Sequence, residues 1–175
     1  MVLKKQFRDE RLCEAMDTYG DYLLRLVYAI VKDEKKAEDV VQEVFIRYYI
    51  NMEKFEGRSS LKTYLYRIAV NECHNYFQSW AYRKIEFSNL LGHLLVNRKS
   101  PEEKLIQRES ETKLAELVET LPLKYREVIW LYYFAELSVV EIGEVLECSP
   151  NTIKTRLVRG RKLAKIAIEE GKDFA

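Results

Sequence analysis

Six basic side chains lie close together near the C-terminus, in a stretch without any acidic residue. Between Cys148 and Ile168 these cations are Lys154, Arg156, Arg159, Arg161, Lys162 and Lys165. Cations spaced along a helix can neutralise the phosphates of a DNA duplex. At the start of the same stretch, Asn151, Thr152 and Thr155 have amide and hydroxyl groups of the kind that read base edges. The pattern indicates duplex DNA binding; the alternative is a solvated basic helix in an ordinary helical domain.

A second cluster combines aromatic, amide and cationic side chains between Leu61 and Lys84. Its aromatic members are Tyr64, Tyr66, Tyr76, Phe77, Trp80 and Tyr82, and they alternate with Lys62, Arg67, Asn71, His74, Asn75, Arg83 and Lys84. Aromatic faces stack on unpaired bases and amides read base edges, so this mixture favours binding of an unstacked strand. The alternative is that the aromatic residues are core, which we expect for Tyr66 and Phe77.

A third set of polar residues, Glu38, Asp39, Gln42, Glu43 and Arg47, lies on the water-facing side of a predicted helix. Taken alone, these residues are most simply solubilising charge. The net charge of the chain is +1, but acidic residues are in excess in Asp9–Glu56 and Glu86–Glu147, each followed by a basic block. Phosphate repels carboxylates, so the acidic blocks are expected to face protein, which suggests a bridge between DNA and a protein partner.

Two short predicted helices joined by a tight turn position the C-terminal cations. Ser138 and Glu141 form a capping box that starts the first helix near Val139, and Ser149 followed by Pro150 starts the second. Only Glu147 and Cys148 separate them, as in a helix-turn-helix. Apolar residues and glycines recur at helical spacing and are expected to be buried, with Gly143 at a close approach: Ile142, Val145, Leu146, Ile153, Leu157, Gly160 and Ala164.

The remaining segments also have helical periodicity, which predicts an all-α fold of two small helical domains joined by a linker. The expected helices span about Glu10–Lys32 with a possible break at Gly20, Asp33 to about Tyr48, Ser60–Arg83, Ser100–Thr120 and Leu123–Phe134; Ile85–Lys99 is the predicted linker, with Leu90–Val96 as a docked turn.

Several function classes have no support in the sequence. Cys13, Cys73 and Cys148 are far apart, which favours neither a disulfide framework nor a zinc site, and Cys73 beside His74 is interpreted as packing. No signal peptide or membrane span is evident, so we expect a reducing, cytoplasmic setting. Nucleophile–base spacing and a Gly-rich phosphate loop are lacking, so no catalytic residue, metal site or cofactor is assigned, and the chain is not expected to be an enzyme.

In the order of these pieces, the chain resembles the bacterial sigma factors, specifically the small extracytoplasmic-function (ECF) subgroup that has only the second and fourth conserved regions. The resemblance implies region 2 at 1–84, a linker at 85–100 that threads toward the polymerase active-site channel, and region 4 at 101–175. The segment Ala37–Phe45 (AEDVVQEVF) is similar to the one that grips the clamp helices of the large polymerase subunit. Carried over, Asp39, Gln42 and Glu43 become polymerase contacts.

The same resemblance implies two DNA-binding sites. Phe55–Asn75 is similar to the part that melts the minus-ten box and holds a flipped base, with Gly57–Leu61 as the pocket rim above Asn71 and Asn75. Tyr64-Leu65 stands where primary sigma factors have an aromatic pair, which implies weaker melting and stricter promoter choice. The implied minus-ten residues are Arg58, Ser59, Ser60, Lys62, Tyr64, Arg67, Asn71, His74 and Asn75; the implied minus-thirty-five residues are Asn151, Thr152, Lys154, Thr155, Arg156 and Arg159.

The resulting hypothesis is a promoter-specificity factor that binds core RNA polymerase, through its clamp and flap, and promoter DNA. An anti-sigma factor is a further expected partner, and no membrane insertion is expected. The alternative is a free-standing helix-turn-helix regulator, which has no reason to carry the aromatic and amide cluster. Glu147 departs from the family pattern, which usually has glycine in the turn; with positive φ it costs about 1 kcal/mol.

Overall fold

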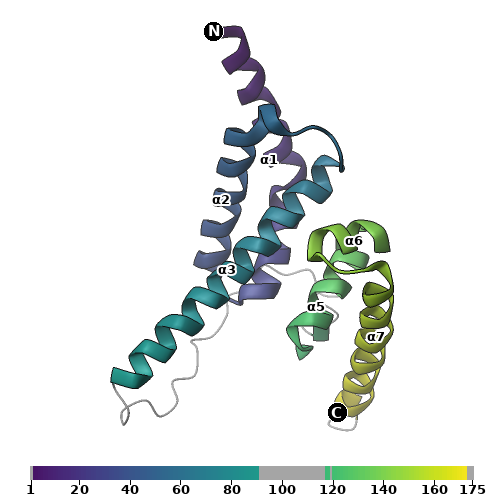
Figure 1. Ribbon diagram of the computed structural model, residues 1–175. Helices are drawn as coiled ribbons and strands as arrows, with labels where there is room; N and C mark the ends of the chain where they lie inside the picture. Colours follow the sequence, from purple (N-terminus) through teal and green to yellow (C-terminus); the bar gives the residue numbers. More distant parts are fainter. Residues whose placement is uncertain (1, 91–116, 119, 173–175) are drawn as a thin grey trace.

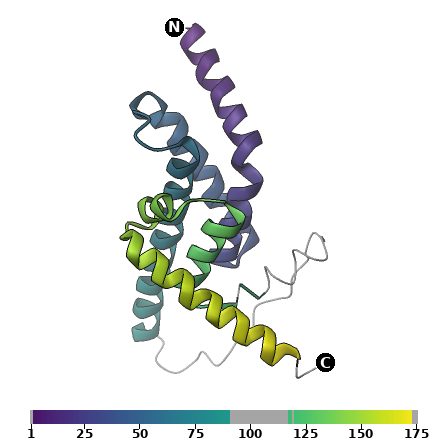
Figure 2. The same ribbon diagram turned by 90° about the vertical axis from the view of Figure 1, so that its right-hand side faces the viewer.

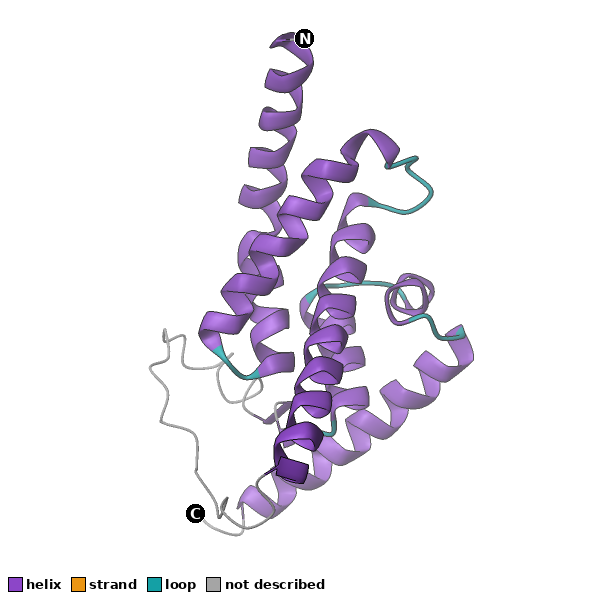
Figure 3. Ribbon diagram, turned by 60° about the vertical axis from the view of Figure 1, so that its left-hand side comes forward, coloured by secondary structure: helices purple, strands orange, loops and turns teal. Residues whose placement is uncertain are grey.

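The computed structural model describes residues 2–90, 117–118 and 120–172, and within these ranges the ordered elements are all helical (Figures 1 and 3). Three helices form an N-terminal bundle: α1 (Val2–Val31), α2 (Glu34–Asn51) and α3 (Leu61–Leu90), with a short 3-10 turn η1 (Met52–Lys54) after α2. The C-terminal helices are α5 (Leu123–Ile129), the π-helical turn η2 (Trp130–Phe134), α6 (Val139–Leu146) and α7 (Pro150–Lys172). The predicted all-α class is confirmed.

The first helix is longer than its sequence pattern indicates. We expected a start near Glu10 and a break at Gly20, but α1 is continuous from Val2, and its first turns extend beyond α2 and α3 (Figure 1). Gly20 has open space where a Cβ would lie, so it neither kinks α1 nor admits a neighbour. Side-chain contacts with α2 support the extension, because Arg8 donates a 2.6 Å hydrogen bond to the Tyr49 carbonyl.

A short connection turns the chain from α1 into α2, as predicted. Lys32 adopts φ 55°, and the Asp33 carboxylate accepts a 2.8 Å hydrogen bond from the Lys36 amide to cap α2.

The apolar faces of the three helices form one core. Its fully buried side chains in this bundle include Leu23, Leu26, Val27, Val44, Tyr48, Leu65, Tyr66 and Val70. Tyr66 is therefore a core residue, as expected, while Phe77 is half-buried at the edge of the core.

The third helix begins where the serine cap predicts but continues further. Gly57, at φ 67°, lets the loop turn, and the Ser60 hydroxyl accepts a 3.0 Å hydrogen bond from the Thr63 amide. The expected end near Arg83 is wrong, because α3 runs to Leu90 and so includes the first part of the predicted linker. The remainder of that linker, the predicted turn in Leu90–Val96 and most of the predicted helix Ser100–Thr120 lie outside the described residues.

The C-terminal helices pack directly against the N-terminal bundle. Helix α6 contacts α3, while α5 contacts α1, and α7 crosses the outer side of α5 (Figure 2). Arg126 of α5 donates a 2.9 Å hydrogen bond to the Ala29 carbonyl of α1. The two groups of helices, far apart in the sequence, therefore form one closed arrangement.

Candidate nucleic-acid and partner interfaces

The helix-turn-helix predicted at the C-terminus is present with its caps. The Ser138 hydroxyl accepts from the Glu141 amide at 3.2 Å, and Glu141 accepts from the Ser138 amide at 2.9 Å, which is the predicted capping box. These hydrogen bonds from Ser138 hold the pKa of the Glu141 carboxyl below its ordinary value. At the second helix, Ser149 accepts a 3.2 Å hydrogen bond from the Thr152 amide, and α7 begins at Pro150 as expected.

The turn between α6 and α7 takes the left-handed conformation at Glu147, with φ 52° and ψ 41°. This geometry closes the helix, because the Cys148 amide donates a 3.0 Å hydrogen bond to the Gly143 carbonyl. The turn thus has the backbone shape that favours glycine, although its sequence has a glutamate. The close approach at Gly143 is to this turn: a Cβ there would lie 2.8 Å from the Cys148 carbonyl oxygen.

Replacing Glu147 with glycine is expected to raise the free energy of unfolding by about 1 kcal/mol, because it removes the strain of a β-carbon at positive φ. Urea unfolding followed by circular dichroism measures the change. The matched control is Glu144→Gly in α6, where glycine has no such conformational advantage and should destabilise by about 1 kcal/mol. A destabilising effect at both positions would contradict this explanation.

The recognition helix α7 buries one face and leaves the other open. Ile153 and Leu157 are buried, as is Gly160, which meets Ile129 and Tyr125 of α5, while Ala164 is half-buried. Among the candidate minus-thirty-five residues, Asn151, Lys154, Thr155 and Arg159 are exposed, and Thr152 and Arg156 are half-buried. A shallow hollow of about 370 Å³ lies along this face, lined by Lys124 and Tyr125 of α5 together with Asn151, Thr152, Thr155, Arg156 and Arg159.

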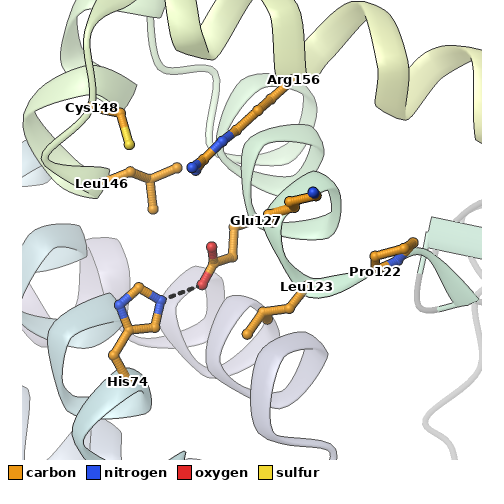
Figure 4. A pocket seen from close by; sticks show the side chains of 8 residues that line it. His74, Pro122, Leu123, Glu127, Leu146, Cys148 and Arg156 are labelled. Atoms are coloured by element: carbon orange, nitrogen blue, oxygen red, sulfur yellow. Dashed lines mark hydrogen bonds and ion pairs between the residues drawn. The ribbon is translucent and has the colours of Figure 1, made fainter.

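Lys124 and Tyr125 join this surface only through the tertiary fold, since neither is near α7 in the sequence. Burial raises the pKa of the Tyr125 phenol, but hydrogen bonds and positive charge from Arg159 and Lys124 outweigh burial and lower it below its ordinary value. Tyr125 and Arg159 therefore interact at the open face. Arg156 is positioned differently, because it also lines the hollow between the two groups of helices (Figure 4).

The candidate minus-ten residues separate onto two sides of α3. At 100° per residue, Tyr64, Arg67, Asn71 and Asn75 fall on one stripe opposite the buried face. Asn75 lies about 20 Å along the helix from Leu61, at 1.5 Å per residue. These side chains therefore form a track along α3, and Asn75 is too distant to lie beneath the Gly57–Leu61 rim as the resemblance implied. Of the loop candidates, Arg58 and Ser60 are exposed and Ser59 is half-buried.

His74 lies at the edge of this stripe, about 20° from Arg67 around the axis and on the side of α3 that faces the C-terminal helices, whereas Lys62 is about 120° away from His74. His74 Nε2 is 2.6 Å from Glu127 Oε1 of α5 (Figure 4). This hydrogen bond to Glu127 raises the pKa of the His74 imidazole above its ordinary value, although burial opposes the shift. Nearer the start of α3, the Thr63 hydroxyl donates a 3.3 Å hydrogen bond to Glu141 Oε1, and the positive charge of Lys62 also acts on Glu141.

A hollow of about 470 Å³ lies beside the His74–Glu127 pair, between α3 and the C-terminal helices. It is lined by His74, Pro122, Leu123, Lys124, Glu127, Leu146, Cys148 and Arg156 (Figure 4). Cys73 points into the core beside it, and burial raises the pKa of its thiol to about 12, in agreement with a packing role. Among the described residues, no group of three or more potential metal ligands gathers anywhere.

The candidate polymerase-binding residues form a stripe on α2. At 100° per residue, Asp39, Gln42 and Glu43 share one side of the helix, and the exposed side chains of Ile46 and Ile50 continue it. Arg47 borders the stripe and joins it to α3, because it is 2.8 Å from Glu43 and 2.9 Å from Glu72. The two isoleucines are 52% and 64% exposed and add an apolar end that their sequence positions alone did not indicate.

Comparison with known proteins gives the same two-part division. The family model for Sigma-70 region 2 matches residues 15–83, and the model for Sigma-70, region 4 matches residues 111–163. The ECF RNA polymerase sigma factor SigW of Bacillus subtilis is 31% identical, over 93% of this chain and 94% of the relative. The ECF RNA polymerase sigma-E factor of Escherichia coli is 34% identical, over 71% and 69%.

Two solved structures share the fold. The sigma factor RpoE in complex with the anti-sigma factor NepR, from Bartonella quintana, has a TM-score of 0.67 at 21% identity, covering 89% of this chain and 97% of that chain. CnrH in complex with the cytosolic domain of CnrY has a TM-score of 0.66 at 18% identity, covering 93% and 90%.

A helical bundle followed by a helix-turn-helix, matched by these two conserved regions, is the architecture of a transcription initiation factor of the sigma-70 type. The chain belongs to the ECF sigma factors, which have regions 2 and 4 only, and it directs core RNA polymerase to its promoters. Sigma factors are not enzymes. In the part of the chain that the structure describes, no helix is long and apolar enough to cross a bilayer.

Proposed function

We propose that the chain reads two promoter boxes with separate helices: α7 reads the minus-thirty-five duplex and α3 holds the melted minus-ten strand. The observation that supports this most directly is the open face of α7, where Asn151, Thr155 and Arg159 are exposed on a capped helix-turn-helix. Cations on that face suit phosphates, and its amide and hydroxyl groups suit base edges. The family membership argues against a free-standing helix-turn-helix regulator.

For the melted strand, the proposal rests on the track along α3, where Asn75 is exposed and Tyr64, Arg67 and Asn71 are half-buried. Tyr64 stacks at a tilt on Phe55, with ring centres 4.9 Å apart, and the Arg67 guanidinium lies 5.8 Å from the Tyr64 ring centre. A half-exposed ring held between a second ring and a cation is a suitable platform for an unpaired base. Asn71 and Asn75, further along the same stripe, supply amide groups for base edges.

The protein partners in the proposal are core RNA polymerase and an anti-sigma factor. We assign Asp39, Gln42 and Glu43 of α2 to the clamp of the large polymerase subunit, and the outer surface of the C-terminal helices to the flap. An anti-sigma partner is supported by the related complexes with NepR and CnrY. We further propose region 2 up to the end of α3, region 4 in the C-terminal part, no membrane insertion and action in the cytoplasm, where sigma factors work.

Run-off transcription tests the proposed function. The purified chain plus core RNA polymerase is expected to start transcription from a subset of fragments in a genomic library that core alone ignores. Sequencing the starts should reveal two shared boxes, one at minus-ten and one at minus-thirty-five. Products with only one shared box would contradict reading by two helices, and absence of both polymerase binding and products would overturn the whole proposal.

A further inference from the structure

The shallow hollow between α5 and α7 gathers positive charge. It is lined by Lys124 of α5 and by Arg156 and Arg159 of α7, and its other lining groups are a phenol, two hydroxyls and an amide. The described residues around this hollow therefore include no carboxylate. The one carboxylate of α5, Glu127, lines the other hollow, where it pairs with His74. A concave surface of this composition suits an anion with several acceptor oxygens.

Tyr125 lies between two of these cations, one from each helix. A β-carbon on Gly160 would lie 3.4 Å from the Tyr125 β-carbon, so α5 and α7 are in contact one residue after Arg159. The Lys124 ammonium is 5.0 Å from the centre of the Tyr125 ring. Burial raises the pKa of the phenol, but hydrogen bonds from Arg159 and Lys124 lower it, so the phenol oxygen accepts from both cations. Its own hydrogen remains available for a third group.

The hollow lies on a flank of α7 and not on the middle of its open face. At about 100° per residue, Arg159 is about 40° and Arg156 about 100° from the exposed Thr155 around the axis. With α7 in the major groove, as proposed above, the middle of the open face meets base edges, and its flanks meet the sugar–phosphate strands that border the groove. Helix α5 packs on this flank, so Lys124 and Tyr125 would lie beside one of these strands.

We propose that Lys124 and Tyr125 of α5, together with Arg159 of α7, form a binding site for one backbone phosphate of the minus-thirty-five duplex. The ammonium and the guanidinium supply positive charge, and the Tyr125 hydroxyl donates to a phosphate oxygen while it positions both cations. The inference rests on the proposed role of α7 and adds α5 to the duplex-binding surface. A shallow hollow suits a polymer held by many such contacts, whereas a free nucleotide needs a pocket that encloses it.

Promoter duplexes with single neutral phosphates test the site directly. The full chain with core RNA polymerase is titrated with duplexes in which one phosphate at a time, through the minus-thirty-five box and its flanks, is replaced by a methylphosphonate. At the phosphate that Lys124 binds, the replacement should weaken binding about fivefold, the upper end for an exposed ion pair. Lys124→Gln should weaken binding to the unmodified duplex by a similar factor. In this variant the same replacement should have no further effect, because its partner is gone.

Two further variants separate the phosphate site from total charge and from packing. Lys162→Gln is the matched control, because it removes the same charge from an exposed lysine of α7 outside the hollow, and the effect of that methylphosphonate should persist. Tyr125→Phe keeps the ring that packs at Gly160 but loses the hydroxyl. Its urea unfolding should be unchanged, while the effect of the same methylphosphonate should shrink. If every methylphosphonate weakens the Lys124→Gln complex as much as the wild-type complex, the site is overturned.

Salt and sequence dependence give an independent readout. Lys124→Gln should reduce the slope of log affinity against log salt concentration by about 0.9, the value for one phosphate contact, and should weaken binding equally on all box sequences. A loss that depends on the box sequence would indicate a base contact and overturn the site. Saturable binding of pyrophosphate to the free chain, lost in Lys124→Gln, would also overturn it, because the ligand would then be a small phosphate compound. Wild-type binding that ignores base changes in the minus-thirty-five box would instead count against the proposed function, so the two failures are distinguishable.

Discussion

Replacing Gln42 with alanine and Glu43 with lysine is expected to weaken binding of the chain to core RNA polymerase by more than about thirtyfold, or about 2–5 kcal/mol. The reason is electrostatic. The α2 stripe presents carboxylates and an amide to the proposed polymerase contact. A positively charged partner surface that attracts Glu43 would repel a lysine at the same position. Run-off transcription should fall in parallel, because polymerase binding precedes promoter use. Fluorescence anisotropy of the labelled chain, titrated with core polymerase, measures the affinity.

The matched control for this pair of substitutions is Glu38→Lys. Glu38 is an exposed carboxylate of the same helix, about 100° away from Asp39 around the axis, and its replacement changes the net charge by the same amount. Because Glu43 also pairs with the half-exposed Arg47, the stability of the double variant must be checked, although an exposed pair contributes less than about 1 kcal/mol. If the control weakens polymerase binding as much as the double variant does, the effect is one of total charge and the α2 stripe is not the contact.

The second large effect is expected at Gly143. A β-carbon there would lie 2.8 Å from the backbone carbonyl oxygen of Cys148, which cannot move away without opening the turn. Gly143→Val should therefore destabilise the helix-turn-helix by about 3 kcal/mol, a cost of overpacking that exceeds the small gain in helix propensity. The variant should lose binding to promoter duplex while the surface of α2 is unchanged.

Two measurements check this result. Urea unfolding should show an early transition for the C-terminal helices, and core polymerase binding through α2 should persist although promoter-directed transcription is lost. The control is Gly20→Ala in α1, where a β-carbon meets open space and should stabilise by up to about 1 kcal/mol. A Gly143→Val chain with unchanged unfolding would show that the turn can rearrange at little cost.

The sequence alone determined the local structure of the helix-turn-helix. Its capping box at Ser138 and Glu141 and its second start at Ser149-Pro150 occur where expected, because a cap depends on residues within one turn of each other. The family, and with it the function, also followed from the order of segments. Helix ends were less well predicted: α1 and α3 extend beyond their patterns, since adding a residue to an existing helix costs little and no strong signal stops either helix at the expected residue.

Only the tertiary structure decided which side chains of α3 face the C-terminal helices. In the sequence, His74 is one member of a mixed cluster, and nothing near it indicates that Glu127 will lie 2.6 Å away. The same is true of Tyr125 of α5, which interacts with Arg159 of α7 although the two residues are far apart in the sequence. Periodicity assigns a residue to one side of its helix, but the partner on that side depends on how helices distant in sequence pack, and this depends on contacts summed over the whole core.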